Sequence, residues 1–98
     1  MLEPIVAIAA AEVFPGKEAE FENLARELFD LIRKKDYGAD RLVRSLRQPN
    51  LYYDIRDWSS REAAEQAHRD PEIHSLWTRL DKVCRVTEVV SAAREVLP

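Results

Sequence analysis

The residues best suited to chemistry lie close together on one short segment. In the run Leu51–Trp58 (LYYDIRDW), period-two alternation places Tyr52, Asp54, Arg56 and Trp58 on one face. Two aromatic rings with an acid and a base suit neither a dry core nor plain solvent. We therefore interpret this face as the lining of a cavity.

Each of these side chains offers a defined role in such a cavity. Tyr52 and Trp58 would be aromatic walls, and Arg56 would be a donor that stabilises an anion. Either Asp54 or the nearby His68 would be the base. Structural alternatives stay open, because Asp54 and Arg56 can satisfy one another and a helix-end histidine can bond to the backbone.

The segments before this run predict a strand and a helix. Ile5–Val13 is rich in Ile, Val and Ala and is followed by Pro15-Gly16, which favours a strand. Its alternating alanines leave space beside the face that they share: Ala7, Ala9 and Ala11. From Lys17 an apolar residue recurs at helical spacing, and Gly38 is the expected stop of this amphipathic helix.

A hairpin leads into the run Leu51–Trp58. The second face of that run carries Leu51, Tyr53 and Ile55 and is typical of a core. Arg41–Leu46 alternates as a strand, and Gln48-Pro49-Asn50 turns the chain.

Two helical segments and a strand complete the pattern. After Trp58, Ser59 with Glu62 has the spacing of a capping box and predicts a helix start. Asp70-Pro71 restarts the helix, so this second helix is expected to be kinked or double. Arg85–Ala92 is predicted as the last strand and Arg94–Pro98 as a tail.

The order strand, helix, strand, strand, helix, strand predicts an α+β, ferredoxin-like fold. Such a fold has a four-stranded antiparallel sheet with its helices on one face. The other face is left bare, and we expect it to carry Tyr52 and Trp58. A second copy of the same sheet is the most economical cover, so the sequence predicts a homodimer.

Size and composition set the remaining limits. Ninety-eight residues suit one domain, 1–98, and a net charge of −3 argues against nucleic acid as a partner. The apolar start is interrupted by Glu3, Pro4 and Glu12, which argues against a signal peptide or membrane span and favours a cytoplasmic protein. Cys84 is the only cysteine and is expected to be a small buried hydrophobe.

Several short motifs, in this order, resemble the antibiotic biosynthesis monooxygenase family: Pro15-Gly16-Lys17-Glu18 with Phe21, then Gly38, Pro49-Asn50, Trp58, Glu62-Ala63, His68 and Pro71. The resemblance implies a dimeric α+β barrel. It also implies oxygenation of a small phenol, hydroquinone or anthrone by O2 without flavin, haem or metal. The sequence has no glycine-rich phosphate loop, HExxH motif or His and Cys cluster, so no cofactor and no metal site are predicted.

The fold implied by the resemblance also serves two other functions. Haem-degrading members of the family use an Asn in the first strand and a Trp and His near the second helix, whereas Ala67 and Trp77 occupy the corresponding positions here. Haem degradation is therefore disfavoured. A non-catalytic dimeric module that binds a small ligand stays open, and a closed, fully paired network of polar residues would favour it.

Overall fold

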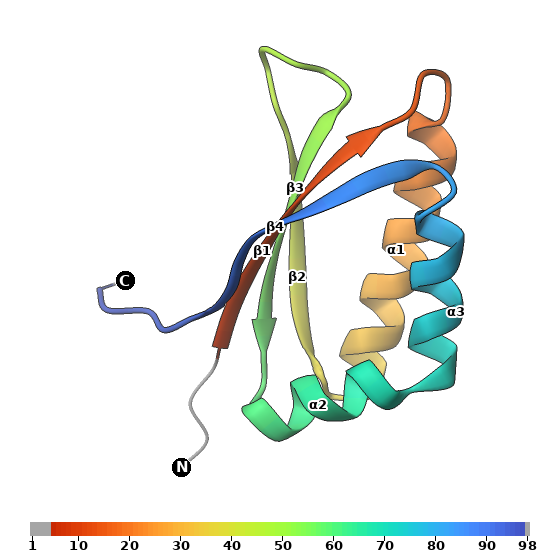
Figure 1. Ribbon diagram of the computed structural model, residues 1–98. Helices are drawn as coiled ribbons and strands as arrows, with labels where there is room; N and C mark the ends of the chain where they lie inside the picture. The colour runs from red at the N-terminus through yellow and green to blue at the C-terminus, as the bar shows by residue number, and fades with distance from the viewer. Residues whose placement is uncertain (1–4, 98) are drawn as a thin grey trace.

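The computed structural model describes residues 5–97, and its elements follow the predicted order. They are β1 (Ile5–Val13), α1 (Glu18–Lys34), β2 (Gly38–Arg44), β3 (Leu51–Trp58), α2 (Arg61–Arg69), α3 (Pro71–Leu80) and β4 (Cys84–Ala93). The strands form one antiparallel sheet in the order β2-β3-β1-β4. All three helices lie on one side of it, which confirms the ferredoxin-like fold (Figure 1).

Two predictions made from the sequence, for the apolar start of the chain and for its tail, include residues beyond 5–97. Glu3 and Pro4, and Pro98 at the end of the tail, lie outside the described residues. Within 5–97, none of the helices has the length and apolar character needed to span a membrane.

The core lies between α1, α3 and the sheet. The predicted apolar stripe of α1 is buried, and Ile32 on α1 and Ile73 on α3 are both 0% exposed. Val13 and Val83 close the same core next to β1 and β4. Burial of side chains of this size contributes about 1.5–3 kcal/mol each, so these contacts fix α1 and α3 against the sheet.

The helix starts confirm one predicted cap and correct another. Asp70 caps α3 ahead of Pro71, so the second helix is double as expected. The cap of α2 is Ser60, which accepts a hydrogen bond from the Ala63 amide, and the prediction of Ser59 was wrong by one residue. Ser59 instead continues the line of β3, with its amide donating to the Tyr37 carbonyl at 2.8 Å.

The junction between α2 and α3 is tied to the loop after α1. Asp70 accepts hydrogen bonds from Lys35 Nζ at 2.7 Å and from the Tyr37 hydroxyl at 2.8 Å. These donors, with the two capped amides, hold the pKa of Asp70 down at about 2. The hydrogen bonds anchor the α2–α3 corner over the end of β3.

The structure shows which face of the sheet the helices cover, and it corrects the prediction made from the sequence. Tyr52 and Trp58 are only 2% and 4% exposed, because they lie under the helices. The prediction that they lie on the bare face was wrong. The bare face instead carries the half-buried Leu51, Tyr53 and Ile55, which had been interpreted as core. Period-two alternation separates the two faces of a strand but does not show which one the helices take.

The start of β2 also differs from the prediction. Helix α1 ends at Lys34, before Gly38, and Asp36 takes the left-handed conformation in the turn. Gly38 opens β2, which therefore begins three residues before the predicted Arg41. A Cβ at Gly38 would lie 2.3 Å from the carbonyl oxygen of Asp57, so only glycine permits this close approach of β2 to β3.

Candidate functional site

A cavity of about 350 Å³ lies between the helix-covered face of the sheet and the helices. Its floor includes Ala7, Ala9 and Ala11 of β1, which confirms that these small side chains leave space. The paired strand β3 places Arg56 opposite Ala7 and Asp54 opposite Ala9. Each large side chain of β3 thus lies beside a small alanine of β1, and the polar groups of β3 face the cavity.

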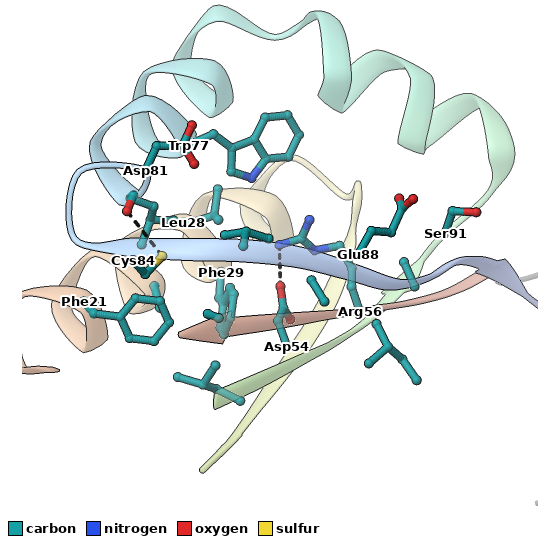
Figure 2. Close-up of a pocket in the computed structure, with 18 of the residues that line it drawn as sticks. Phe21, Leu28, Phe29, Asp54, Arg56, Trp77, Asp81, Cys84, Glu88 and Ser91 are labelled. Atoms are coloured by element: carbon teal, nitrogen blue, oxygen red, sulfur yellow. Dashed lines mark hydrogen bonds and ion pairs between the residues drawn. The ribbon is translucent and has the colours of Figure 1, made fainter. Parts of the chain in front are cut away.

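The walls of the cavity are mostly apolar and come from several elements. The apolar lining includes Phe21, Leu28, Phe29, Leu42, Trp58 and Trp77. The polar and charged lining is Asp54, Arg56, His68, Asp81, Glu88 and Ser91. Figure 2 labels Asp54, Arg56, Asp81, Glu88 and Ser91 among these residues. An apolar pocket with a few converging polar groups is typical of a small-molecule site.

Arg56 is the centre of the polar groups. Its Nη2 donates to Asp54 at 2.9 Å and its Nε donates to Asp40 on β2 at 2.5 Å. Its side chain is 10% exposed and that of Asp40 is 0% exposed, so this network is buried. The structural alternative that Asp54 and Arg56 satisfy one another is confirmed, and both still line the cavity.

The environment of Asp54 favours its protonated form. Burial and the neighbouring carboxyl of Asp40 outweigh the attraction of Arg56 and raise the pKa of Asp54 to about 8. Its Oδ1 atom and that of Asp40 are buried and accept no hydrogen bond within residues 5–97. A carboxyl group that titrates near neutrality inside a cavity is a candidate acid or base.

Aromatic rings form one side of the site. The guanidinium carbon of Arg56 lies 4.9 Å from the centre of the Trp58 ring, a cation–π distance. The His68 ring follows at 5.8 Å from Trp58 and at 5.2 Å from Trp77. The row Trp58, His68 and Trp77 spans from β3 across α2 to α3 and provides flat apolar surface.

His68 is exposed and lies at the rim, although it lines the cavity. Its Nδ1 lies 2.6 Å from the Ala64 carbonyl oxygen, which confirms the predicted bond to the backbone. If Nδ1 donates this bond, Nε2 is left as the basic nitrogen.

Tyr52, the other predicted aromatic wall, does not line the cavity. Its ring packs 4.8 Å from that of Phe21, and its hydroxyl donates to Glu22 at 2.5 Å. Burial and this bond raise the pKa of Tyr52 to about 12. The position is two residues along β3 from Asp54, where helix α1 fills the space.

Two residues of the site were missed by the sequence reasoning. Asp40 lay outside the predicted strand, which began at Arg41, yet it pairs with Arg56 across the hairpin. Centring the hairpin on Gln48, the first residue of the predicted turn, would have aligned them, because Asp40 and Arg56 both lie eight residues from it. Trp77 was assigned to the core; it packs against the core, but its half-buried ring also lines the cavity.

The described residues contain no group of three or more His, Cys, Asp or Glu side chains that would hold a metal ion. Cys84 is buried and its thiol donates to the Leu80 carbonyl at 3.3 Å. Burial raises the pKa of Cys84 to about 11, so the thiol is protonated and packs as a small apolar group, as expected.

Comparison with solved structures shows the same fold in other proteins. SnoaB, a cofactor-independent oxygenase from Streptomyces nogalater, is 22% identical with a TM-score of 0.84, and the match covers 98% of each chain. A putative antibiotic biosynthesis monooxygenase from Bordetella bronchiseptica is 22% identical with a TM-score of 0.81, over 97% of this chain and 99% of that one. A conserved protein from Methanosarcina mazei Go1 is 19% identical with a TM-score of 0.83, over 97% and 95% of the two chains.

Sequence comparison identifies the family. No curated protein matches this chain with significant similarity. The family model described as antibiotic biosynthesis monooxygenase matches residues 4–77, which include the cavity residues Asp54, Arg56, Trp58, His68 and Trp77. Because the match spans most of the chain, the protein belongs to the antibiotic biosynthesis monooxygenase family.

Proposed function

We propose that this protein is a cofactor-independent monooxygenase that oxidises a small aromatic quinol, phenol or anthrone-type substrate with O2. One observation carries the proposal: a buried carboxyl and guanidinium pair, Asp54 and Arg56, faces an apolar cavity of about 350 Å³. Family membership and the fold shared with the SnoaB oxygenase support the reaction class.

The cavity has the size and the walls for a small aromatic molecule. Ligand pockets commonly enclose about 300–1,000 Å³, and this cavity lies at the lower end of that range. Trp58 and Trp77 offer ring faces for stacking, and the small alanine side chains of β1 leave room for the ligand. Tyr52 belongs to the core in this proposal and has no contact with the substrate.

The first chemical step is removal of an acidic proton from the substrate. The Asp54 carboxylate takes that proton, and free N–H groups of Arg56 stabilise the resulting oxyanion. Arg56 has five N–H donors, and its contacts with the two carboxylates occupy one at Nε and one at Nη2. Donors thus remain on the guanidinium for a substrate oxygen.

The electrons for O2 come from the deprotonated substrate. For an anthrone, the reacting CH2 and O2 give C=O and H2O, so one oxygen atom enters the product and the other leaves as water. Carbon supplies all four electrons, and no external reductant is required. The apolar walls exclude bulk water from the reactive anion.

Asp54 is favoured over His68 as the base. The Asp54 side chain is 20% exposed and bonded to Arg56, whereas the exposed His68 lies at the rim. A base with a pKa of about 8 is also better matched to a phenol, whose pKa is about 10, than an ordinary carboxylate.

Oxygen uptake tests the function. Wild type, Asp54→Asn, His68→Gln and the control Asp57→Asn would be assayed with hydroquinones and anthrones. Asp57 is exposed on the same strand and lies outside the cavity. We expect Asp54→Asn to lose about 10²-fold or more in kcat and the control to keep its activity. No uptake by wild type with any substrate would contradict the proposal.

The same proposal includes a homodimer. The face of the sheet away from the helices carries apolar side chains that a single chain leaves partly open, and Val43 and Val89 on the edge strands are 39% and 54% exposed. A second copy would cover Tyr53 and Ile55, with an interface above about 2,000 Å². We expect a dimer in sedimentation at micromolar concentration, and a monomer for Ile55→Asp. A monomeric wild type would contradict the dimer.

A non-catalytic ligand-binding module is the second candidate. It is favoured by the pairing of Arg56 with both Asp40 and Asp54, because such a network also serves as structure. Binding of an aromatic ligand without oxygen uptake would favour this function.

A further inference from the structure

Asp40 holds an unusual position for a charged residue. Its side chain is 0% exposed, and its Oδ2 accepts the Arg56 Nε hydrogen bond at 2.5 Å. The Asp54 Oδ2 accepts from Nη2 of the same guanidinium at 2.9 Å. The remaining oxygen of each carboxyl, Oδ1, is buried and has no donor among residues 5–97.

Two buried acceptors without donors call for a physical explanation. An unsatisfied buried polar atom is destabilising, and two adjacent carboxylates beside one guanidinium leave an excess negative charge. One proton between the carboxyls removes both problems, since it supplies a donor and makes the group of Asp40, Asp54 and Arg56 neutral. The geometry brings the two carboxyls together, because both accept hydrogen bonds from the Arg56 guanidinium, one from Nε and one from Nη2.

We propose that Asp40 and Asp54 share one proton, and that Asp40 is a positioning residue that makes Asp54 a base suited to a phenol or quinol. The catalytic part of this inference rests on the proposed function, whereas the shared proton does not. Asp40 touches no substrate in this arrangement and acts through Asp54 and Arg56.

No other charged group takes the place of Asp40. Strand β1 presents only Ala7 and Ala9 to the pair, and the part of α1 that lines the cavity is apolar. The other titratable groups that line the cavity are His68 from α2, Asp81 after α3 and Glu88 from β4. Glu88 pairs with Ala9, so β1 separates it from Asp54.

The proton balance of the step follows from this arrangement. When both carboxyls are ionised, the pair accepts the substrate O–H proton at Asp54, and the O–H bond breaks as the carboxyl O–H forms. The proton is then shared with Asp40, and the substrate oxyanion lies near Arg56. Release of the proton to water restores the base.

Carbon-detected NMR of the carboxyl groups in the wild-type protein tests the shared proton directly. With aspartate labelled at Cγ, we expect the Asp40 signal to change together with the Asp54 signal as Asp54 gains or loses its proton. A change at Asp54 alone, or no change at either signal between pH 6 and 10, would overturn the shared proton. This measurement needs no substrate and no substitution.

Asp40→Asn tests the positioning role. The amide keeps an acceptor for Arg56 and donates to Asp54, so the Asp54 transition should move down by more than about one pH unit. The pH at which kcat/KM rises should decrease by the same amount. The maximal kcat should also fall, because the base is weaker. Asp57→Asn is the matched control and should shift neither.

An Asp54 transition that stays near pH 8 in Asp40→Asn would overturn the role of Asp40. If the variant does not fold, the wild-type NMR titration still decides whether the two carboxyls share a proton. A shared proton in a protein without oxygen uptake would support the pair and contradict only the proposed function.

Discussion

Replacing Arg56 with methionine is expected to destabilise the protein strongly. The substitution keeps an apolar stem under Trp58 and removes the only cation that hydrogen-bonds to Asp40 and Asp54 among the described residues. Removing one partner of a buried ion pair costs about 3–5 kcal/mol, because the remaining charge is left unpaired. For a domain of this size, that corresponds to a fall in Tm of about 12–40 °C.

The assay is urea unfolding at fixed protein concentration, at pH 6 and pH 9. The loss should be greater at pH 9, which lies above the pKa of about 8 of Asp54. Arg44→Met is a matched control, because Arg44 also lies over an aromatic ring, at 5.0 Å from the centre of Tyr52, but its side chain is 46% exposed. We expect the control to cost about 1 kcal/mol or less.

A triple variant separates charge from packing. Adding Asp40→Asn and Asp54→Asn to Arg56→Met removes the unpaired carboxylates and should recover much of the lost free energy. A cost of Arg56→Met no greater than that of Arg44→Met, or a triple variant less stable than Arg56→Met, would refute a stabilising role for this buried ion pair.

Three further predictions concern stability. The folded-state pKa of Asp54 is raised from 3.8 to about 8, so the folded state holds the proton more tightly than the unfolded state. The free energy of unfolding should therefore fall as pH rises through this range. The urea midpoint of Asp54→Asn should not show this fall. The pKa of Asp70 is lowered from 3.8 to about 2, so its contribution to stability is present above pH 4 and is lost as pH falls to 2. In acid unfolding, Asp70→Asn should not show this loss of stability. Gly38→Ala should cost about 1–3 kcal/mol in urea unfolding, because its Cβ would meet the Asp57 carbonyl oxygen at 2.3 Å.

The sequence predicted the element order well because each element has its own local signal. The apolar stripe of α1 and the Asp70-Pro71 cap of α3 act within a few residues, and both were found. The cavity face of β3 was also recognised, since an acid and a base beside Trp58 fit no ordinary core. Local chemistry was therefore sufficient for the fold and for most of the site.

Features that depend on contacts between elements were missed. Which face of β3 the helices cover depends on packing, so Tyr52 and Trp58 were assigned to the wrong side. Asp40 becomes part of the site only through the β2–β3 register, and the predicted strand started one residue too late to include it. Tyr52 lies away from the cavity because Phe21 of α1 packs on it, which no periodicity in β3 reveals.

The most direct test of the account is the pH dependence of kcat/KM for wild type relative to Asp54→Asn, measured by oxygen uptake with one quinol or anthrone. The ratio cancels ionisation of the substrate, which affects both proteins equally. With a pKa of about 8 for Asp54, the fraction in the base form increases about tenfold between pH 7 and pH 9. We expect the ratio to rise about tenfold over this range, and a ratio that stays constant would contradict the role of Asp54 as the base.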